Sequence, residues 1–109
     1  MKLADYQEIK GRLTAAQAIF DDASSPKDKL FALGALLKGA HPKLEAVFSQ
    51  TEKEFSKLDI LFNGNVVTLS AEMLPENTEE EKKKKKGLLL FLGFWNKLKG
   101  EIIRVQGEL

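Results

Sequence analysis

The chain has 109 residues, which is enough for one domain with a single hydrophobic core. Its net charge of +1 excludes a global electrostatic attraction to nucleic acid or acidic lipid. The absence of cysteine excludes disulfides, thiolate metal sites and cysteine nucleophiles. The N-terminal segment lacks the apolar core of a signal peptide. We therefore expect one cytoplasmic domain over residues 1–109.

Two helices are predicted in the first third of the chain. Apolar residues recur at intervals of three and four from about Lys2 to Asp22, the pattern of an amphipathic helix. A second such stripe runs from Pro26 to about Lys38. Ser25 before Pro26 is a favourable helix start, because serine can accept a hydrogen bond from a free backbone N–H and proline fits the first turn. Gly39 then indicates where this helix ends.

The third element has two interpretations. A stripe with the same spacing continues from Pro42 to about Leu74 and predicts one long helix that passes straight through Gly64. The alternative is a small β-hairpin at Asn63-Gly64, because this dipeptide favours a tight hairpin turn and β-branched residues follow it. We favour the long helix, since an isolated two-stranded hairpin is only marginally stable.

The last third of the chain predicts a helix from Thr78 to Leu109. Thr78 and Glu81 have the spacing of a capping box, in which each side chain accepts a hydrogen bond from the other's backbone. Leu89 and Leu90 lie nearly opposite the main apolar stripe, at roughly 100° per residue. The main stripe has a seven-residue period and consists of Leu88, Phe91, Trp95, Leu98, Ile102, Val105 and Leu109.

Together these elements predict an all-α protein, an up-and-down four-helix bundle with two shorter N-terminal helices and a long C-terminal helical hairpin. The hairpin at Asn63-Gly64 is the alternative. In the bundle, the first two helices are too short to cover a third helix that reaches Leu74. The uncovered apolar surface predicts a protein-interaction site, for which our candidates are Val66, Leu69, Met73, Leu89 and Leu90.

Three glycines share one side of the last helix at seven-residue spacing: Gly93, Gly100 and Gly107. Each glycine disfavours a helix by about 1 kcal/mol relative to alanine. A ridge of glycines lets a second helix approach closely, so we predict close helix packing here. Chance spacing is the competing explanation, because isolated glycines occur in helices for many reasons.

No motif commits the chain to a reaction. His41 is the only histidine, and it has no nucleophile or carboxylate at a recognisable spacing, so we expect it to cap a helix or lie at the surface. The acidic residues match neither a calcium loop nor a di-iron site. We therefore expect a non-enzymatic protein with no catalytic residue, no metal site and no cofactor.

A basic run opens the last helix: Lys82, Lys83, Lys84, Lys85 and Lys86. It is a candidate for anion contact in a nucleic-acid-binding protein, but three glutamates precede it and no aromatic residues interleave with it to stack on bases. Beside Leu89 and Leu90 it also resembles the charged face of a peripheral membrane helix. We favour a role in protein–protein interaction, as an adaptor, chaperone-like or assembly protein. The expected partner is a second copy in a homodimer, or another protein.

Overall fold

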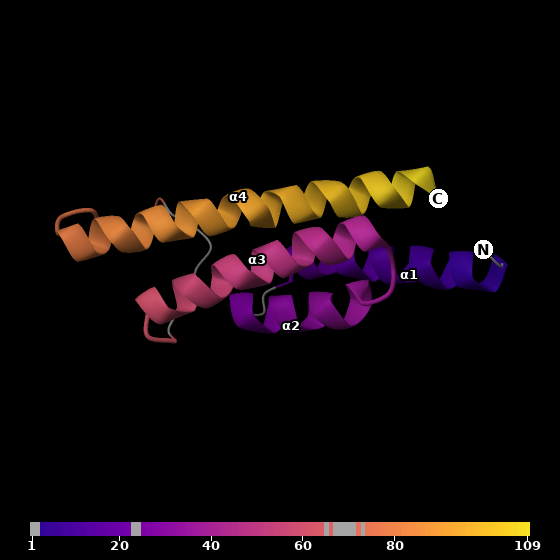
Figure 1. The fold of residues 1–109 in the computed structure, drawn as a ribbon, viewed down its shortest axis with the longest axis horizontal. Coiled ribbons are helices and arrows are strands. Elements are labelled where there is room, and N and C mark those ends of the chain that lie inside the picture. Colours follow the sequence, from indigo (N-terminus) through magenta and orange to yellow (C-terminus); the bar gives the residue numbers. More distant parts are fainter. Residues whose placement is uncertain (1–2, 23–24, 65, 67–71, 73) are drawn as a thin grey trace.

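The computed structural model describes residues 3–22, 25–64, 66, 72 and 74–109. Within these residues the protein is all-α and has no strand; its helices are α1 (Leu3–Phe20), α2 (Pro26–Leu37), α3 (Pro42–Leu61) and α4 (Glu79–Glu108). Successive helices run in alternating directions, and α4 spans most of the molecule (Figure 1). The molecule measures 55 × 23 × 20 Å. The predicted all-α class with four helices is confirmed.

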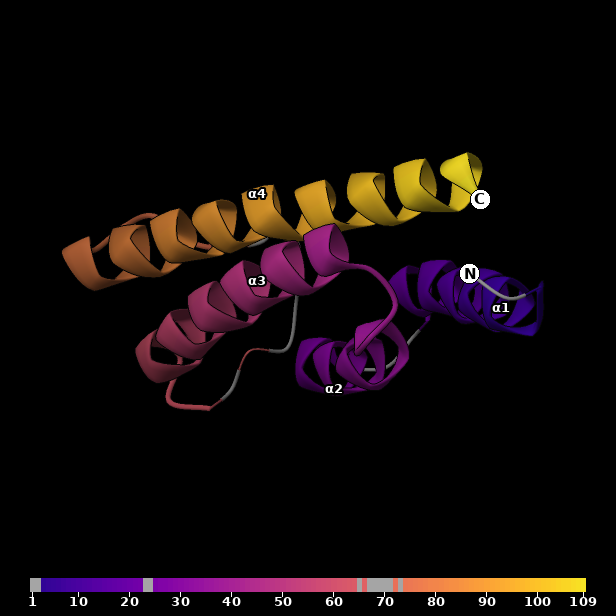
Figure 2. The same cartoon turned by 45° about the vertical axis from the view of Figure 1, so that its right-hand side comes forward.

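The helices contact one another in a ring. α4 packs against α1 and α3, while α2 packs against α1 and, over fewer residues, against α3. Within the described ranges the backbones of α2 and α4 do not approach each other closely, and Figure 2 shows α2 on the side of the molecule away from α4. The side between α2 and α3 is therefore the least closely packed side of the bundle.

The apolar stripe of α4 supplies the centre of the core. Aromatic rings link it to two other helices: the Trp95 and Phe20 ring centroids are 4.6 Å apart, and those of Phe91 and Phe55 are 5.5 Å apart. Tilted aromatic pairs add about 0.5–1.5 kcal/mol each beyond the area they bury. The predicted stripe is confirmed over its buried residues, which are Leu88, Phe91, Trp95, Leu98, Ile102 and Val105.

Two helices begin at the capping residues that the sequence predicts. The Ser25 hydroxyl accepts a hydrogen bond from the Asp28 N–H at 3.3 Å at the start of α2. At the start of α4, Thr78 and Glu81 form a complete capping box, with both hydrogen bonds at 3.1 Å. Because these contacts are local, the sequence was sufficient to place both helix starts.

The prediction that the third helix passes through Gly64 is wrong, because α3 ends at Leu61. Asn63 and Gly64 have φ angles of 52° and 80°, in the left-handed region where a right-handed helix cannot continue. The Asn63 N–H donates to the carbonyl of Ile60 at 3.1 Å. The Gly64 N–H donates to the carbonyl of Asp59 at 2.8 Å. These two hydrogen bonds form a Schellman motif, which satisfies the free carbonyls at the end of α3.

The alternative hairpin is also wrong in its first strand, since Leu58–Leu61 is the last turn of α3. Val67 and Leu69, which would form the second strand, lie outside the described residues. With α3 at 20 residues and α1 at 18, the two helices have nearly the same length. The long uncovered end of the third helix, from which we predicted an interaction site, is therefore not present.

Close approach between helices uses glycines that the sequence analysis did not single out. A Cβ atom on Gly34 of α2 would lie 3.1 Å from the Phe48 ring of α3. A Cβ atom on Gly87 of α4 would lie 3.0 Å from a Leu61 methyl carbon. Gly34 thus sets how closely α2 approaches α3, and Gly87 does the same for α3 and α4.

Candidate protein-interaction surfaces

The five residues predicted to form an interaction surface do not lie together. Val66 is only 7% exposed and belongs to the core, so its assignment to an exposed surface is corrected. Leu69 and Met73 lie outside the described residues. Leu89 and Leu90 are 53% and 56% exposed, on the side of α4 away from the core. Of the candidates that the structure describes, only Leu89 and Leu90 are exposed.

Leu89 belongs to a continuous exposed stripe that we call the outer face of α4. Ile103, near the other end of the stripe, is 50% exposed. Leu90, Phe94 and Lys97 widen the stripe and, together with Leu89, line an open hollow of about 280 Å³. The outer face consists of Leu89, Gly93, Asn96, Gly100, Ile103 and Gly107, all of them exposed and spaced alternately by four and three.

The glycines of the outer face make no close packing contact within the described part of the chain. A Cβ atom at Gly93, Gly100 or Gly107 would meet no other atom within 4 Å. The close helix packing predicted for them is therefore not seen among the described residues of one molecule, and it stays a prediction. Gly93 and Gly100 leave open backbone between the large side chains of Leu89 and Ile103, and Gly107 does the same beyond Ile103.

The lysine run is partly neutralised by neighbouring carboxylates. Lys82 pairs with Glu79 at 3.6 Å, and Lys84 pairs with Glu80 at 3.8 Å. Lys85 pairs with a glutamate that precedes the helix, at 2.9 Å. Such exposed pairs stabilise a helix only slightly, but they lower the positive charge available to an anion. Of the five lysines, Lys83 and Lys86 have no ion pair within the described residues.

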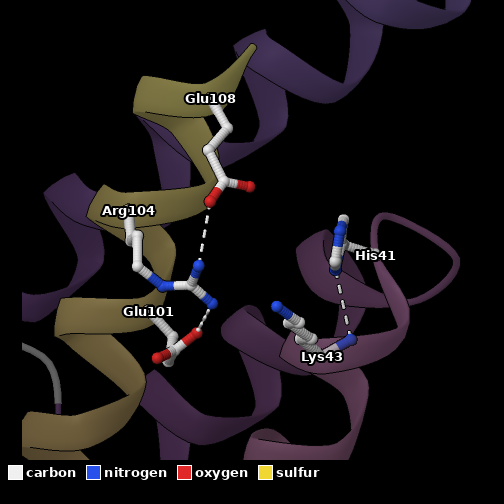
Figure 3. Close-up of polar contacts among 5 residues, drawn as sticks. All are labelled: His41, Lys43, Glu101, Arg104 and Glu108. Atoms are coloured by element: carbon white, nitrogen blue, oxygen red, sulfur yellow. Dashed lines mark hydrogen bonds and ion pairs between the residues drawn. The ribbon is translucent and has the colours of Figure 1, made fainter.

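A polar cluster lies where the last turns of α4 pass the start of α3 (Figure 3). Arg104 donates hydrogen bonds to Glu101 at 2.5 Å and to Glu108 at 2.9 Å. The bond from Arg104 lowers the pKa of Glu101 below its ordinary value. His41 Nδ1 accepts a hydrogen bond from the Lys43 N–H at 3.1 Å, so the histidine caps α3 as predicted. Neither contact pairs a nucleophile with a base.

The sequence analysis missed a second exposed apolar surface, between α2 and α3. Phe31 is 84% exposed and Ile60 is 76% exposed, and both line one open hollow of about 440 Å³. A second hollow of about 380 Å³ continues between the same two helices, from Gly34 and Phe48 to Lys38 and its neighbours. We call the two hollows together the α2–α3 seam.

No family model, curated protein or solved structure matches this chain. Within the described ranges, no group of three or more His, Asp and Glu side chains lies close enough together to hold a metal ion. A search of the same residues for a membrane span finds no helix with the necessary length and hydropathy. The outer face of α4 and the α2–α3 seam are thus the surfaces from which a function can be argued.

Proposed function

We propose that this protein is a non-enzymatic helical protein that acts through protein–protein contact and pairs with a second copy through the outer face of α4. The symmetry of that face supports the proposal most directly. Along the outer face, the neighbour of Asn96 in either direction is a glycine, Gly93 on one side and Gly100 on the other. Each direction then meets a large exposed side chain, Leu89 or Ile103, seven residues from Asn96.

A face of this kind is complementary to itself when two helices run antiparallel. Gly93 of one copy would lie beside Gly100 of the other, which brings the two backbones close together. Leu89 of one copy would then lie beside Ile103 of the other at both ends of the contact. The two-fold axis repeats the contact between Leu89 and Ile103 at each end of the pair, so the dimer removes twice as much apolar surface from water as one such contact would.

The charges at the ends of α4 favour the same direction. In the antiparallel pair, Lys86 lies near Glu108 of the second copy and near the C-terminal end of its helix. That end carries the negative pole of the helix dipole, which attracts cations. A parallel pair would place the two lysine runs side by side and would be opposed by their repulsion.

One pair of helices buries less surface than a typical stable interface of about 800 Å² per partner. We therefore expect a reversible dimer whose population depends on concentration. Such a dimer would be an adaptor or assembly unit that presents two copies of every other surface.

Light scattering on a sizing column, over a wide range of concentrations, tests the proposal. At high concentration the wild-type protein is expected to approach twice the 12.2 kDa mass of one chain. The double substitution Leu89→Asp with Ile103→Asp should keep the protein at the mass of one chain, because it places charges in the apolar contacts. Both side chains are about half exposed, so the fold should tolerate the change.

The matched control replaces two exposed apolar residues elsewhere, Phe31→Asp with Ile60→Asp, and should leave the dimer intact. A wild-type protein that keeps the mass of one chain at every concentration would exclude self-pairing. If this monomer then pelleted with vesicles of anionic lipid at low salt, the same face would be assigned to a membrane surface instead.

A further inference from the structure

The α2–α3 seam is not used by the proposed pairing through α4. Its two apolar side chains, Phe31 and Ile60, are the most exposed large hydrophobic residues in the described part of the chain. They come from different helices and line the same hollow, whose floor includes buried Leu30 and Phe55. Two large apolar side chains that share one groove mark a binding surface more strongly than scattered ones do.

The shape of the seam suits one helix. α2 and α3 run antiparallel and approach each other through Gly34 and Phe48, while the space above them stays open. The seam is as long as α2, which has 12 residues, or about 18 Å at 1.5 Å per residue. On the α3 side the lining residues run from Glu45 to Ile60, about 22 Å by the same rise, so an amphipathic helix of about four turns covers the seam with its apolar side.

The two walls of the seam carry opposite charges. The α3 wall holds Glu45, Glu52 and Asp59, which are seven residues apart and therefore recur at intervals of about 10 Å. The α2 wall holds Lys27 near one end and Lys38 near the other. Glu45 also accepts a hydrogen bond from the backbone at the end of α2, which fixes its place in the wall.

We propose that the α2–α3 seam binds a short amphipathic helix of a partner protein, with basic residues along the flank that lies on α3 and acidic residues along the flank that lies on α2. The basic residues would recur every seventh position to match Glu45, Glu52 and Asp59. Leucine-like residues between the flanks would cover Phe31 and Ile60. The contact is a helix-in-groove interaction in which charge sets the orientation.

Orientation provides a sharp test, because turning a helix end for end exchanges its two flanks. The probe is a synthetic 18-residue helical peptide with a leucine stripe, lysines on one flank, glutamates on the other and a nitroxide label at its N-terminus. A second peptide has the same composition with the two flanks exchanged. Each is added, at concentrations where the peptide alone is monomeric, to ¹⁵N-labelled protein, and NMR records which amides are broadened.

The two peptides are expected to bind in opposite directions, so their N-terminal nitroxides should broaden amide signals at opposite ends of the seam, one near Ile60 and the other near Phe48. Replacing Phe31→Ser with Ile60→Ser should weaken binding of both peptides by at least about tenfold. The control Leu89→Ser with Ile103→Ser should leave the affinity within about twofold. Broadening at the same end for both peptides would overturn the charge assignment. Binding that survives Phe31→Ser with Ile60→Ser would overturn the seam as the site.

The seam does not depend on the proposed pairing through α4, and the two ideas fail separately. If the substitutions at Leu89 and Ile103 abolish self-association, that result does not bear on whether the peptides bind to the seam. A protein whose dimer dissolves on changing Phe31 and Ile60 instead would assign the seam to a second copy of this chain. That result would overturn the partner-helix proposal and the pairing through α4 together.

Discussion

Arg104 pairs with one carboxylate a turn before it in α4 and another a turn after it, so the titration of Glu101 reports on the local structure. The hydrogen bond from Arg104 is the largest cause of the lowered pKa of Glu101, and the charges of Arg104 and Lys43 add to it. A lowered pKa in the folded state favours folding above the ordinary pKa of 4.5. That contribution is lost as the pH falls through the lowered folded-state value.

We therefore expect Arg104→Gln to return the pKa of Glu101 toward 4.5. Titration of the Glu101 carboxyl carbon by NMR measures this directly. The control Lys43→Gln should raise the pKa of Glu101 by less, because Lys43 acts only through its charge. A larger rise with Lys43→Gln than with Arg104→Gln would contradict the geometry in Figure 3.

Gly11 and Gly100 form a matched pair for testing the role of the glycine ridge. Both are exposed helical residues with open space where a Cβ atom would lie. Alanine at either position should raise the free energy of unfolding of the monomer by about 0.5–1 kcal/mol, because glycine is the poorer helix former. Chemical denaturation at low protein concentration measures this gain.

Only Gly100→Ala should also weaken the dimer, since its methyl group would meet Gly93 of the second copy. Light scattering on the two variants separates the effects. If the Gly100→Ala and Gly11→Ala variants have the same dissociation constant, close packing of the glycines does not contribute to self-association. That result would leave the contacts of Leu89 and Ile103 as the only support for the pairing.

At the scale of the element, the end of α3 shows which signals in a sequence are decisive. The starts of α2 and α4 were predicted correctly because capping is a contact between residues three apart. Asn63-Gly64 was interpreted as a hairpin turn or as part of a helix. The same dipeptide also favours a left-handed helix end, which the structure shows. Because the apolar spacing of three and four continues past Gly64, the pattern alone did not indicate that the helix ends there.

The substitution Gly64→Ala distinguishes the two descriptions of α3 by its sign. In a continuous helix, alanine would raise the free energy of unfolding by about 1 kcal/mol. At the observed φ of 80°, alanine should lower it by about 1 kcal/mol, because its Cβ crowds the backbone in a left-handed conformation. Denaturant unfolding gives the sign, and Asn63→Gly, which relieves the same kind of strain, should have the opposite effect.

The candidate surfaces were only partly predictable for a related reason. The exposure of Leu89 and Leu90 follows from their angle on α4, which the sequence gives directly. Ile60 likewise lies about 200° around α3 from buried Leu58, so its exposure also follows from its angle. That Phe31 and Ile60 line the same hollow depends instead on the spacing of α2 and α3, which is set by contacts among distant residues such as Gly34 and Phe48. No local pattern encodes that spacing, so the seam became visible only in the folded chain.

For the whole molecule, the positions of the two surfaces decide what an assembly could do. In the described part of the chain α2 lies on the side of the molecule away from α4 (Figure 2), so a dimer through the outer face of α4 would leave both α2–α3 seams open. Two seams held by one dimer can engage two helices of the same partner, and linked binding raises the apparent affinity without new contacts. The combination would suit an adaptor that gathers its partner in pairs.

The centre of such a dimer contains one unfavourable feature, which gives a test of the symmetry itself. The two-fold axis would pass close to Asn96 and Lys97, so the Lys97 ammonium groups of the two copies would lie on the same side of the helix pair. Like charges about 4 Å apart in water repel by about 1 kcal/mol. Lys97→Gln should therefore lower the dissociation constant of the dimer by about fivefold.

Sedimentation equilibrium on the wild type and Lys97→Gln measures this change, with Lys53→Gln on the exposed side of α3 as the control that removes the same charge elsewhere. Tighter association of Lys97→Gln alone requires the two Lys97 side chains to face each other, which only an axis near Asn96 provides. Weaker association would mean that Lys97 contacts an oppositely charged group of the second copy. The helices would then pair in another register, and Gly93 would not lie beside Gly100.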